Sequence, residues 1–212
     1  MPGTVCAIIT TVTEHSTPPS DVLASLRAAT AERHAILDRA MPLAREVPTH
    51  ADYRDHLLIL RAWLAPLENW LVRFDDGPQD ATRLPVVTRT PLIERDLTHP
   101  SIPAGATAVP DIDIDSLPGD AAFRWGLCYV IEGSQLGGTV LYRQLAQRLA
   151  PHPLQYLGAG QSPGPRWQQF LQALRAGVTT STDIALACEG ARRAFDDLIA
   201  RIPADTATVA SQ

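Results

Sequence analysis

The sequence has few cysteines and no long hydrophobic run, and these absences exclude several classes of protein. Its three cysteines, Cys6, Cys128 and Cys188, are odd in number and widely spaced. They form no CxxC pair, no iron–sulfur spacing and no disulfide framework. No segment approaches the roughly 20 apolar residues of a transmembrane helix. The apolar start of the chain lacks a basic region and a small-residue cleavage site, which argues against a secretory signal. We therefore expect a cytoplasmic protein that does not span a membrane.

Basic charge is also scarce. Lys and Arg number 18 against 23 Asp and Glu, a formal net charge of −5, which argues against nucleic-acid binding. The 212 residues and 45% hydrophobic content suit one domain with a substantial core. Residues 1–19 lack periodicity and end near "STPPSD". The expected organisation is a tail at 1–19, one domain at 20–202 and a second tail at 203–212.

Helical periodicity dominates the domain, and no convincing alternating strand appears, so the predicted fold is all-α. Ser20 or Asp21 can cap the first helix, and Pro66 should kink or divide the second. Residues 75–118 hold seven of the 18 prolines and predict a long connection; its part at 98–118 is either a surface insertion or a partner-contact loop. The expected helices are about 20–41, 49–74, 91–97, 120–149, 166–175 and 182–201.

Three glycines in the predicted helix at 120–149 require an explanation. Gly133, Gly137 and Gly138 lie within "YVIEGSQLGGTVLYRQLAQRL", and each costs about 1 kcal/mol relative to alanine in a helix interior. Gly133 and Gly137 share a face with Gly138 beside them, and Ser134 lies at the same surface. A face cleared of side chains can accept a flat, rigid ligand on the backbone. The alternative is close packing against another helix.

A histidine on the first helix complements these glycines. His34 lies on the inward edge of "LASLRAATAERHAILDRAM", in line with Thr30 and with Arg27 two turns earlier. A neutral imidazole is a good iron ligand, and the arginine could meet a carboxylate at the edge of a flat ligand. The alternative is a core histidine bonded to a backbone carbonyl. Together the two helices suggest a haem sandwich, with His34 on the proximal side and the glycines on the distal side.

Other histidines offer weaker alternatives. Asp52 and His56 have the i,i+4 spacing of half a dinuclear metal site, but a solvated helix face explains them more simply. His15, His99 and His152 lie near helix breakers and are expected at the surface.

The sequence resembles the haem oxygenase family over about residues 21–200. "LRAATAERHAILD" at 26–38 is similar to the proximal helix of that family, and "YVIEGSQLGGTVL" at 129–141 is similar to the distal helix of its bacterial branch. "LIERDL" at 92–97 and "QYLGAGQSPGPRWQQFLQAL" at 155–174 extend the resemblance. Bacterial members that supply biliverdin to bacteriophytochromes look most similar.

The resemblance implies roles for individual residues. His34 matches the proximal iron ligand, Gly133 and Gly137 the distal glycines, and Ser134 a water-organising position at which animal members have an aspartate. Arg27 takes the place of a propionate-binding basic residue. Arg166 and Arg175 are further propionate candidates, and Tyr129 and Arg143 are candidates to line the site. The expected haem-binding residues are Arg27, Thr30, His34, Gly133, Gly137, Gly138 and Arg175, with Gly133, Ser134 and Gly137 in the catalytic role.

The implied activity consumes haem, O₂ and electrons and releases biliverdin, CO and iron. No nucleotide fingerprint or cysteine cluster suggests a built-in redox centre, so electrons should come from a separate ferredoxin or flavin reductase. Two alternatives belong to other classes. One is a haem-binding or trafficking protein without turnover; the other is a related helical fold with a dinuclear iron site at 52–56 or a haem-free role.

Overall fold

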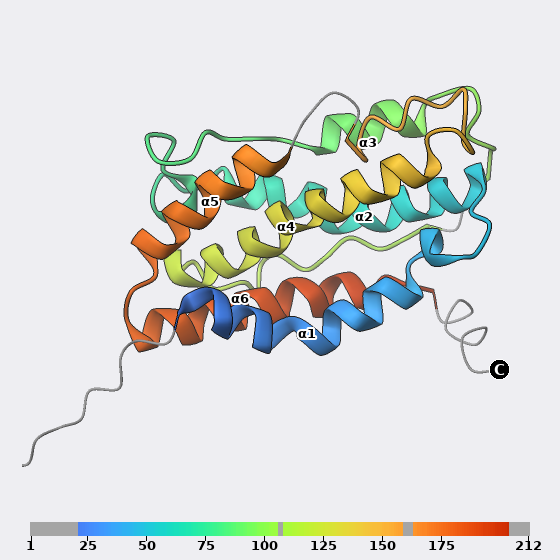
Figure 1. Ribbon diagram of the computed structural model, residues 1–212. Coiled ribbons are helices and arrows are strands. Elements are labelled where there is room, and N and C mark those ends of the chain that lie inside the picture. Colours follow the sequence, from blue (N-terminus) through green and yellow to red (C-terminus); the bar gives the residue numbers. More distant parts are fainter. Residues whose placement is uncertain (1–20, 106–107, 159–162, 204–212) are drawn as a thin grey trace, which may run out of the picture.

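The computed structural model describes residues 21–105, 108–158 and 163–203, and over these ranges every regular element is a helix. The all-α prediction is thus confirmed (Figure 1). The predicted tails lie outside the described residues, apart from Pro203. Within the described ranges no helix is long and apolar enough to cross a membrane. The helices are α1 (Val22–Ala40), η1 (Pro42–Ala44), α2 (His50–Leu71), η2 (Gly77–Gln79), α3 (Thr90–Leu97), α4 (Ala121–Leu145), α5 (Pro163–Gly177) and α6 (Ser181–Ile199).

Side-chain caps explain where several helices begin. The Asp21 carboxylate accepts a hydrogen bond from the Leu23 amide at the start of α1. Thr49 and Asp52 form a reciprocal capping box at the start of α2, and Thr180 and Asp183 form another at α6. These caps satisfy backbone amides that have no partner within the helix. The helix starts predicted near residues 21 and 49 are therefore confirmed.

Pro66 does not divide the second helix, as the sequence had suggested, because α2 continues through it. A proline removes the N–H that would bond the carbonyl four residues earlier, here that of Ala62. The amide of Ile112 donates to this carbonyl at 3.2 Å. The long connection after α3 thus supplies the missing hydrogen bond.

Most described residues of the proline-rich stretch at 98–118 are exposed, but a few of its apolar side chains are buried. In Figure 1 residues 108–118 cross the view between α2 and α6. Ile112 and Leu117 are buried, and Ile114 packs against the core. The brief alternation of "VPDIDIDSL" therefore places apolar side chains inward along an extended segment that forms part of the core.

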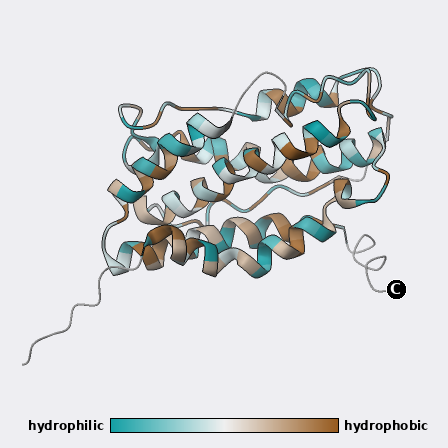
Figure 2. Cartoon of the chain, in the orientation of Figure 1, coloured by the Kyte–Doolittle hydropathy of each residue, from teal (hydrophilic) through white to brown (hydrophobic). Residues whose placement is uncertain are grey.

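Helices α4 and α6 pack together most extensively, and α1 lies on α6 (Figure 1). Hydrophobic and hydrophilic residues alternate along most helices in Figure 2, as expected of amphipathic helices. Glycines allow α4 and α6 to meet backbone to backbone. A Cβ at Gly126 would lie 1.8 Å from the Ala187 carbonyl oxygen, and one at Gly190 would lie 2.0 Å from that of Phe123. The close helix packing considered for the later glycines of α4 is found here instead.

Two histidines expected at the surface are buried. His56 is 7% exposed and His152 is 4% exposed. The Asp52 carboxylate serves the Thr49 cap and pairs with Arg45, so it is not available as the partner of His56. The His152 ring lies between the carbonyl of Asp96 and the amide of Leu154. Both expectations failed because these residues face other elements, which local sequence does not reveal.

Replacing Gly126 by alanine should strongly destabilise the fold. The added methyl would overlap the Ala187 backbone, which cannot move without separating α4 from α6. We expect the free energy of unfolding to fall by about 3 kcal/mol or more, the upper range for overpacked sites. Urea unfolding of the ligand-free protein measures this loss. An unchanged unfolding midpoint would contradict the contact.

Stability should also fall in mild acid because of His56. Burial lowers the pKa of this histidine from 6.5 to about 4, so the unfolded chain binds a proton at pH values where the folded chain does not. The stabilisation is complete above pH 6.5 and is lost as the pH falls toward 4. The contribution of His56 at pH 5 should be about 2 kcal/mol smaller than at pH 7. Urea unfolding of the wild type and of His56→Leu at both pH values isolates this effect, and an identical pH dependence in both would contradict it.

Candidate functional site

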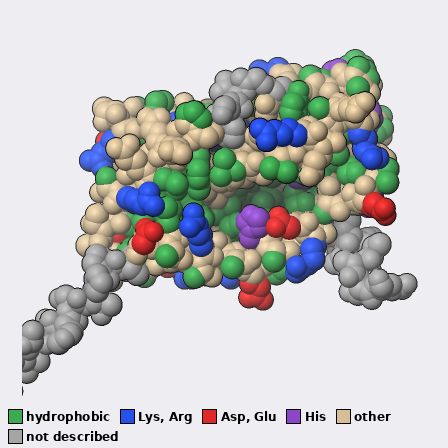
Figure 3. Space-filling view, viewed as in Figure 1, with side chains coloured by type: hydrophobic (Ala, Val, Ile, Leu, Met, Phe, Trp, Pro, Cys, Tyr) green, Lys and Arg blue, Asp and Glu red, His purple; other side chains and the backbone are tan. Residues whose placement is uncertain are grey.

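A hollow opens on the face of the molecule where α1 and α4 lie near one another. In the space-filling view of Figure 3 it lies between the region of α4 above and that of α1 and α6 below, and hydrophobic side chains line it. A histidine and an acidic side chain lie side by side on its α1 edge. Basic side chains also surround it, and because the chain contains no lysine they are all arginines.

His34 is available to a ligand. Its side chain is 65% exposed, so the alternative of a core histidine is wrong. Its Nδ1 lies 2.9 Å from the Asp38 carboxylate, one turn along α1, and its ring is 6.0 Å from that of Phe195 on α6. A carboxylate that accepts from Nδ1–H orients the imidazole ring, and Nε2 is then the nitrogen that can bind a metal. This is the arrangement of a metal-binding imidazole with its carboxylate partner.

Arg27 joins α1 to α4. Burial raises the pKa of the Tyr129 hydroxyl on α4, and the positive charge and hydrogen bond of Arg27 oppose this rise. The Tyr129 ring also packs 5.6 Å from that of Trp167 on α5. Arg175, in the last turn of α5, lies 3.8 Å from Asp21 at the start of α1 and is about half exposed. Arg27 and Arg175 are therefore both near the first two turns of α1.

The three predicted glycines have different surroundings. A Cβ at Gly133 would lie 3.7 Å from the Trp167 ring, and one at Gly138 would lie 3.5 Å from the backbone of Leu157. At Gly137 nothing lies within 4 Å, and the residue is exposed. At these distances a Cβ at Gly133 or Gly138 would make ordinary van der Waals contact, so packing does not require glycine at either position. Only Gly137, of these three, presents bare backbone to open space.

Ser134 and Thr30, which were also predicted to line the site, differ in how accessible their hydroxyl groups are to a ligand. The Ser134 hydroxyl donates to the Ile131 carbonyl at 2.8 Å and remains partly exposed, on the face of α4 between Gly137 and Gly138. Thr30 departs from its predicted haem-binding role: its hydroxyl donates to the Leu26 carbonyl at 2.8 Å, and the residue is only 5% exposed. Thr30 therefore serves core packing.

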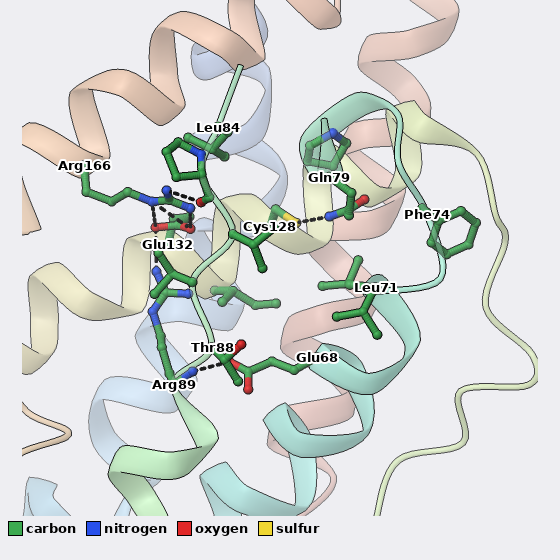
Figure 4. A pocket seen from close by; sticks show the side chains of 16 residues that line it. Glu68, Leu71, Phe74, Gln79, Leu84, Thr88, Arg89, Cys128, Glu132 and Arg166 are labelled. Carbon is green, nitrogen blue, oxygen red and sulfur yellow. Dashed lines mark hydrogen bonds and ion pairs between the residues drawn. The ribbon is translucent and has the colours of Figure 1, made fainter. Parts of the chain in front are cut away.

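The opposite side of α4 carries a buried ion network. The Glu132 carboxylate forms ion pairs with the guanidinium groups of Arg89, at 2.7 Å, and Arg166, at 2.8 Å (Figure 4). Arg166 is thus engaged and does not take the propionate-binding role proposed from sequence. A pocket of about 160 Å³ borders this network, which is smaller than the roughly 300–1,000 Å³ typical of ligand pockets. Because its α4 residues face away from Gly137, it is distinct from the hollow, and we place the candidate site at the hollow.

The hollow has the features that a haem requires. A histidine with a free ring nitrogen lies on one side, bare helix backbone lies on the other, and apolar walls and arginines suit a flat ring with carboxylates. The comparisons with known proteins agree. The profile of the family described as "Heme oxygenase" matches residues 20–200. The chain belongs to the haem oxygenase family.

Two relatives extend this result. A haem oxygenase of Xanthomonas campestris pv. campestris (strain 8004) is 31% identical over 144 residues, which is 67% of this chain and 81% of the relative. The fold is similar to that of the NO- and CO-bound haem oxygenase of Neisseria meningitidis, with a TM-score of 0.61 and 18% identity over 88% of this chain and 92% of that chain. As a haem oxygenase, the chain is an enzyme of haem degradation.

The dinuclear alternative has no support in this structure. Across the described part of the chain, no group of three or more His, Cys, Asp or Glu side chains is placed to hold a metal ion. Asp52 is engaged in its cap, and His56 is enclosed by the core.

Sequence reasoning missed several residues that shape the hollow. The partner of His34, Asp38, had a usable signal in its i,i+4 spacing. Phe195 and Trp167 had none, because they reach the site from α6 and α5.

Replacing Gly137 by alanine or leucine should separate binding from stability. The Cβ of either side chain would enter open space, and both residues have a higher helix propensity than glycine. The free energy of unfolding of the ligand-free protein should therefore stay the same or rise by up to about 1 kcal/mol. Hemin binding should weaken, by about tenfold or more for leucine, equivalent to about 1.4 kcal/mol. Thermal unfolding and a Soret titration measure the two effects. Undiminished hemin affinity in Gly137→Leu would show that the bare backbone does not face the ligand.

Proposed function

We propose that this enzyme cleaves haem with O₂ and externally supplied electrons, and releases biliverdin, CO and ferrous iron. The observation that carries the proposal is the exposed His34–Asp38 pair on the edge of a hollow that faces the bare backbone of Gly137. Helix α1 offers one face of a flat ligand an imidazole that a carboxylate orients. Helix α4 offers the other face a backbone without a side chain at Gly137.

Each residue then has a defined task. Nε2 of His34 would hold the iron, and the hydrogen bond to Asp38 orients the His34 ring. Arg27 and Arg175 neutralise propionate carboxylates with guanidinium groups, which bind such groups in a planar, bidentate manner. Gly137 leaves room on the distal side, as Gly133 does to a lesser degree, and Ser134 supplies a hydroxyl there. Gly138 lies under the loop at Leu157 and shapes the end of this surface.

Bound haem supplies the iron that activates O₂ and the porphyrin rim that is oxidised. The chain supplies position and exclusion of water: apolar side chains line the hollow, and α6 supports α1 behind His34 through Phe195. The sequence contains no flavin or nucleotide motif, so a separate ferredoxin or flavin reductase delivers the electrons. Delivery of biliverdin to a bacteriophytochrome rests on the resemblance of the residue 129–141 motif to that branch.

One equivalent of hemin followed by ascorbate in air tests the activity. We expect a Soret band on hemin addition, then its loss with growth of a broad biliverdin-like absorption toward the red. A stable ferrous or oxy spectrum would indicate a haem carrier, and no Soret shift would contradict the haem site.

His34→Ala should abolish turnover and should weaken hemin binding. Asp38→Asn should weaken hemin binding less, because it keeps the His34 imidazole and removes only the carboxylate charge beside it. A reduction of about 10- to 100-fold in affinity is typical when such an outer partner is altered. His99→Ala is the matched control, since His99 bonds locally to Ser101. Equal turnover in His34→Ala and in the control would exclude His34 as the iron ligand.

A further inference from the structure

A line of polar side chains leads from the distal surface of α4 into the core. The Nε2 of Gln135 donates to the Ser134 hydroxyl and to the Tyr156 hydroxyl, each at 3.4 Å. Tyr156 lies in the loop after α4 and is 4% exposed. Burial raises the pKa of Tyr156, and hydrogen bonding to Gln135 and Ser134 opposes the rise. A buried tyrosine hydroxyl is thus directed toward the one hydroxyl of α4 that lies between Gly137 and Gly138.

The loop that carries Tyr156 is held firmly in place. The buried Asp96 carboxylate accepts the Gln155 amide at 3.0 Å, the Tyr156 amide at 2.8 Å and the Tyr53 hydroxyl at 2.6 Å. The loop backbone at Leu157 also rests on Gly138. Because Asp96 fixes the backbone of Tyr156 and Gly138 allows the loop to approach α4, the position of the Tyr156 hydroxyl follows from the fold and needs no ligand.

The neighbours of Ser134 together set the orientation of its hydroxyl. An isolated serine hydroxyl rotates among three staggered positions. Here its proton is directed to the Ile131 carbonyl, so its oxygen lone pairs are the groups left for the surface of α4. The amide of Gln135 occupies one side of that oxygen and is itself held by Tyr156.

We propose that Tyr156 is a positioning residue of the haem site: directly and through Gln135 it fixes the Ser134 hydroxyl, and so sets the hydrogen-bonding character of the distal face. This rests on the proposed function. Because Ser134 offers an acceptor there, it favours the protonated form of the ligand on the distal side of bound iron. The loop after α4 thereby becomes part of the site, although it reaches the hollow only through other side chains.

The test is the pH midpoint at which the ferric haem complex changes from its acid to its alkaline visible spectrum. Ser134→Ala removes the acceptor and should lower this midpoint by about one pH unit, the equivalent of one hydrogen bond. Tyr156→Phe should lower it in the same direction by about half as much. The double variant should show no more than the Ser134→Ala shift, because the two residues act through one hydroxyl.

Tyr53→Phe is the matched control. It removes a buried tyrosine hydroxyl from the same Asp96 carboxylate but breaks no contact with α4, so its midpoint should equal that of the wild type. Gln135→Leu removes the bridging amide without altering a buried ring, and it should lower the midpoint in the same direction as Tyr156→Phe, which keeps the test open if the latter variant folds poorly.

An unchanged midpoint in Tyr156→Phe and Gln135→Leu, or an equal shift in Tyr53→Phe, would overturn the proposal. The failure of the proposed function is distinct, because wild-type protein that gave no Soret band with hemin would refute the haem site itself.

Discussion

The backbone contact between α4 and α6 is the constraint on which the rest of the structure depends. At Gly126 and Gly190 each helix presents a carbonyl to the other where a side chain would stand. This contact fixes the distance and the rotation of α4 relative to α6. Since α1 packs on α6, and Phe195 of α6 lies beside His34, the same contact also fixes the position of His34 relative to α4. Two glycines far from the hollow therefore set its dimensions.

Helix α4 has a different neighbour on each side. Gly126 faces α6, Glu132 is clamped by two arginines, Gly138 lies beneath a loop, and only the face with Gly137 is left open. A helix with four glycines is costly on its own. Packing on three sides offsets that cost and holds the open face of α4 in position.

Buried charge contributes positional precision more than stability. A buried ion pair gains little net free energy, but breaking one is costly because the remaining charge loses its partner. Glu132 with Arg89 and Arg166 ties α4 to α5 and to the residue just before α3, and Asp96 ties α2 and α3 to the loop of Tyr156. Both networks lie behind the distal surface, where they hold its polar groups in place.

The sequence by itself determined the helices, most of their ends, His34 as the candidate ligand and the glycine-rich face of α4. These depend on caps such as Asp21 and Thr49, on 3.6-residue periodicity and on glycine spacing, all of which act within a few residues. Only the tertiary structure decided that Gly137 is the open glycine, and that Arg166 belongs to Glu132 while Arg27 meets Tyr129. It also decided that His56 and His152 are buried and that Ile112 and Leu117 of the stretch at 98–118 belong to the core. Each of these outcomes depends on a partner tens of residues away, and a local pattern carries no information about which distant element will cover a given face.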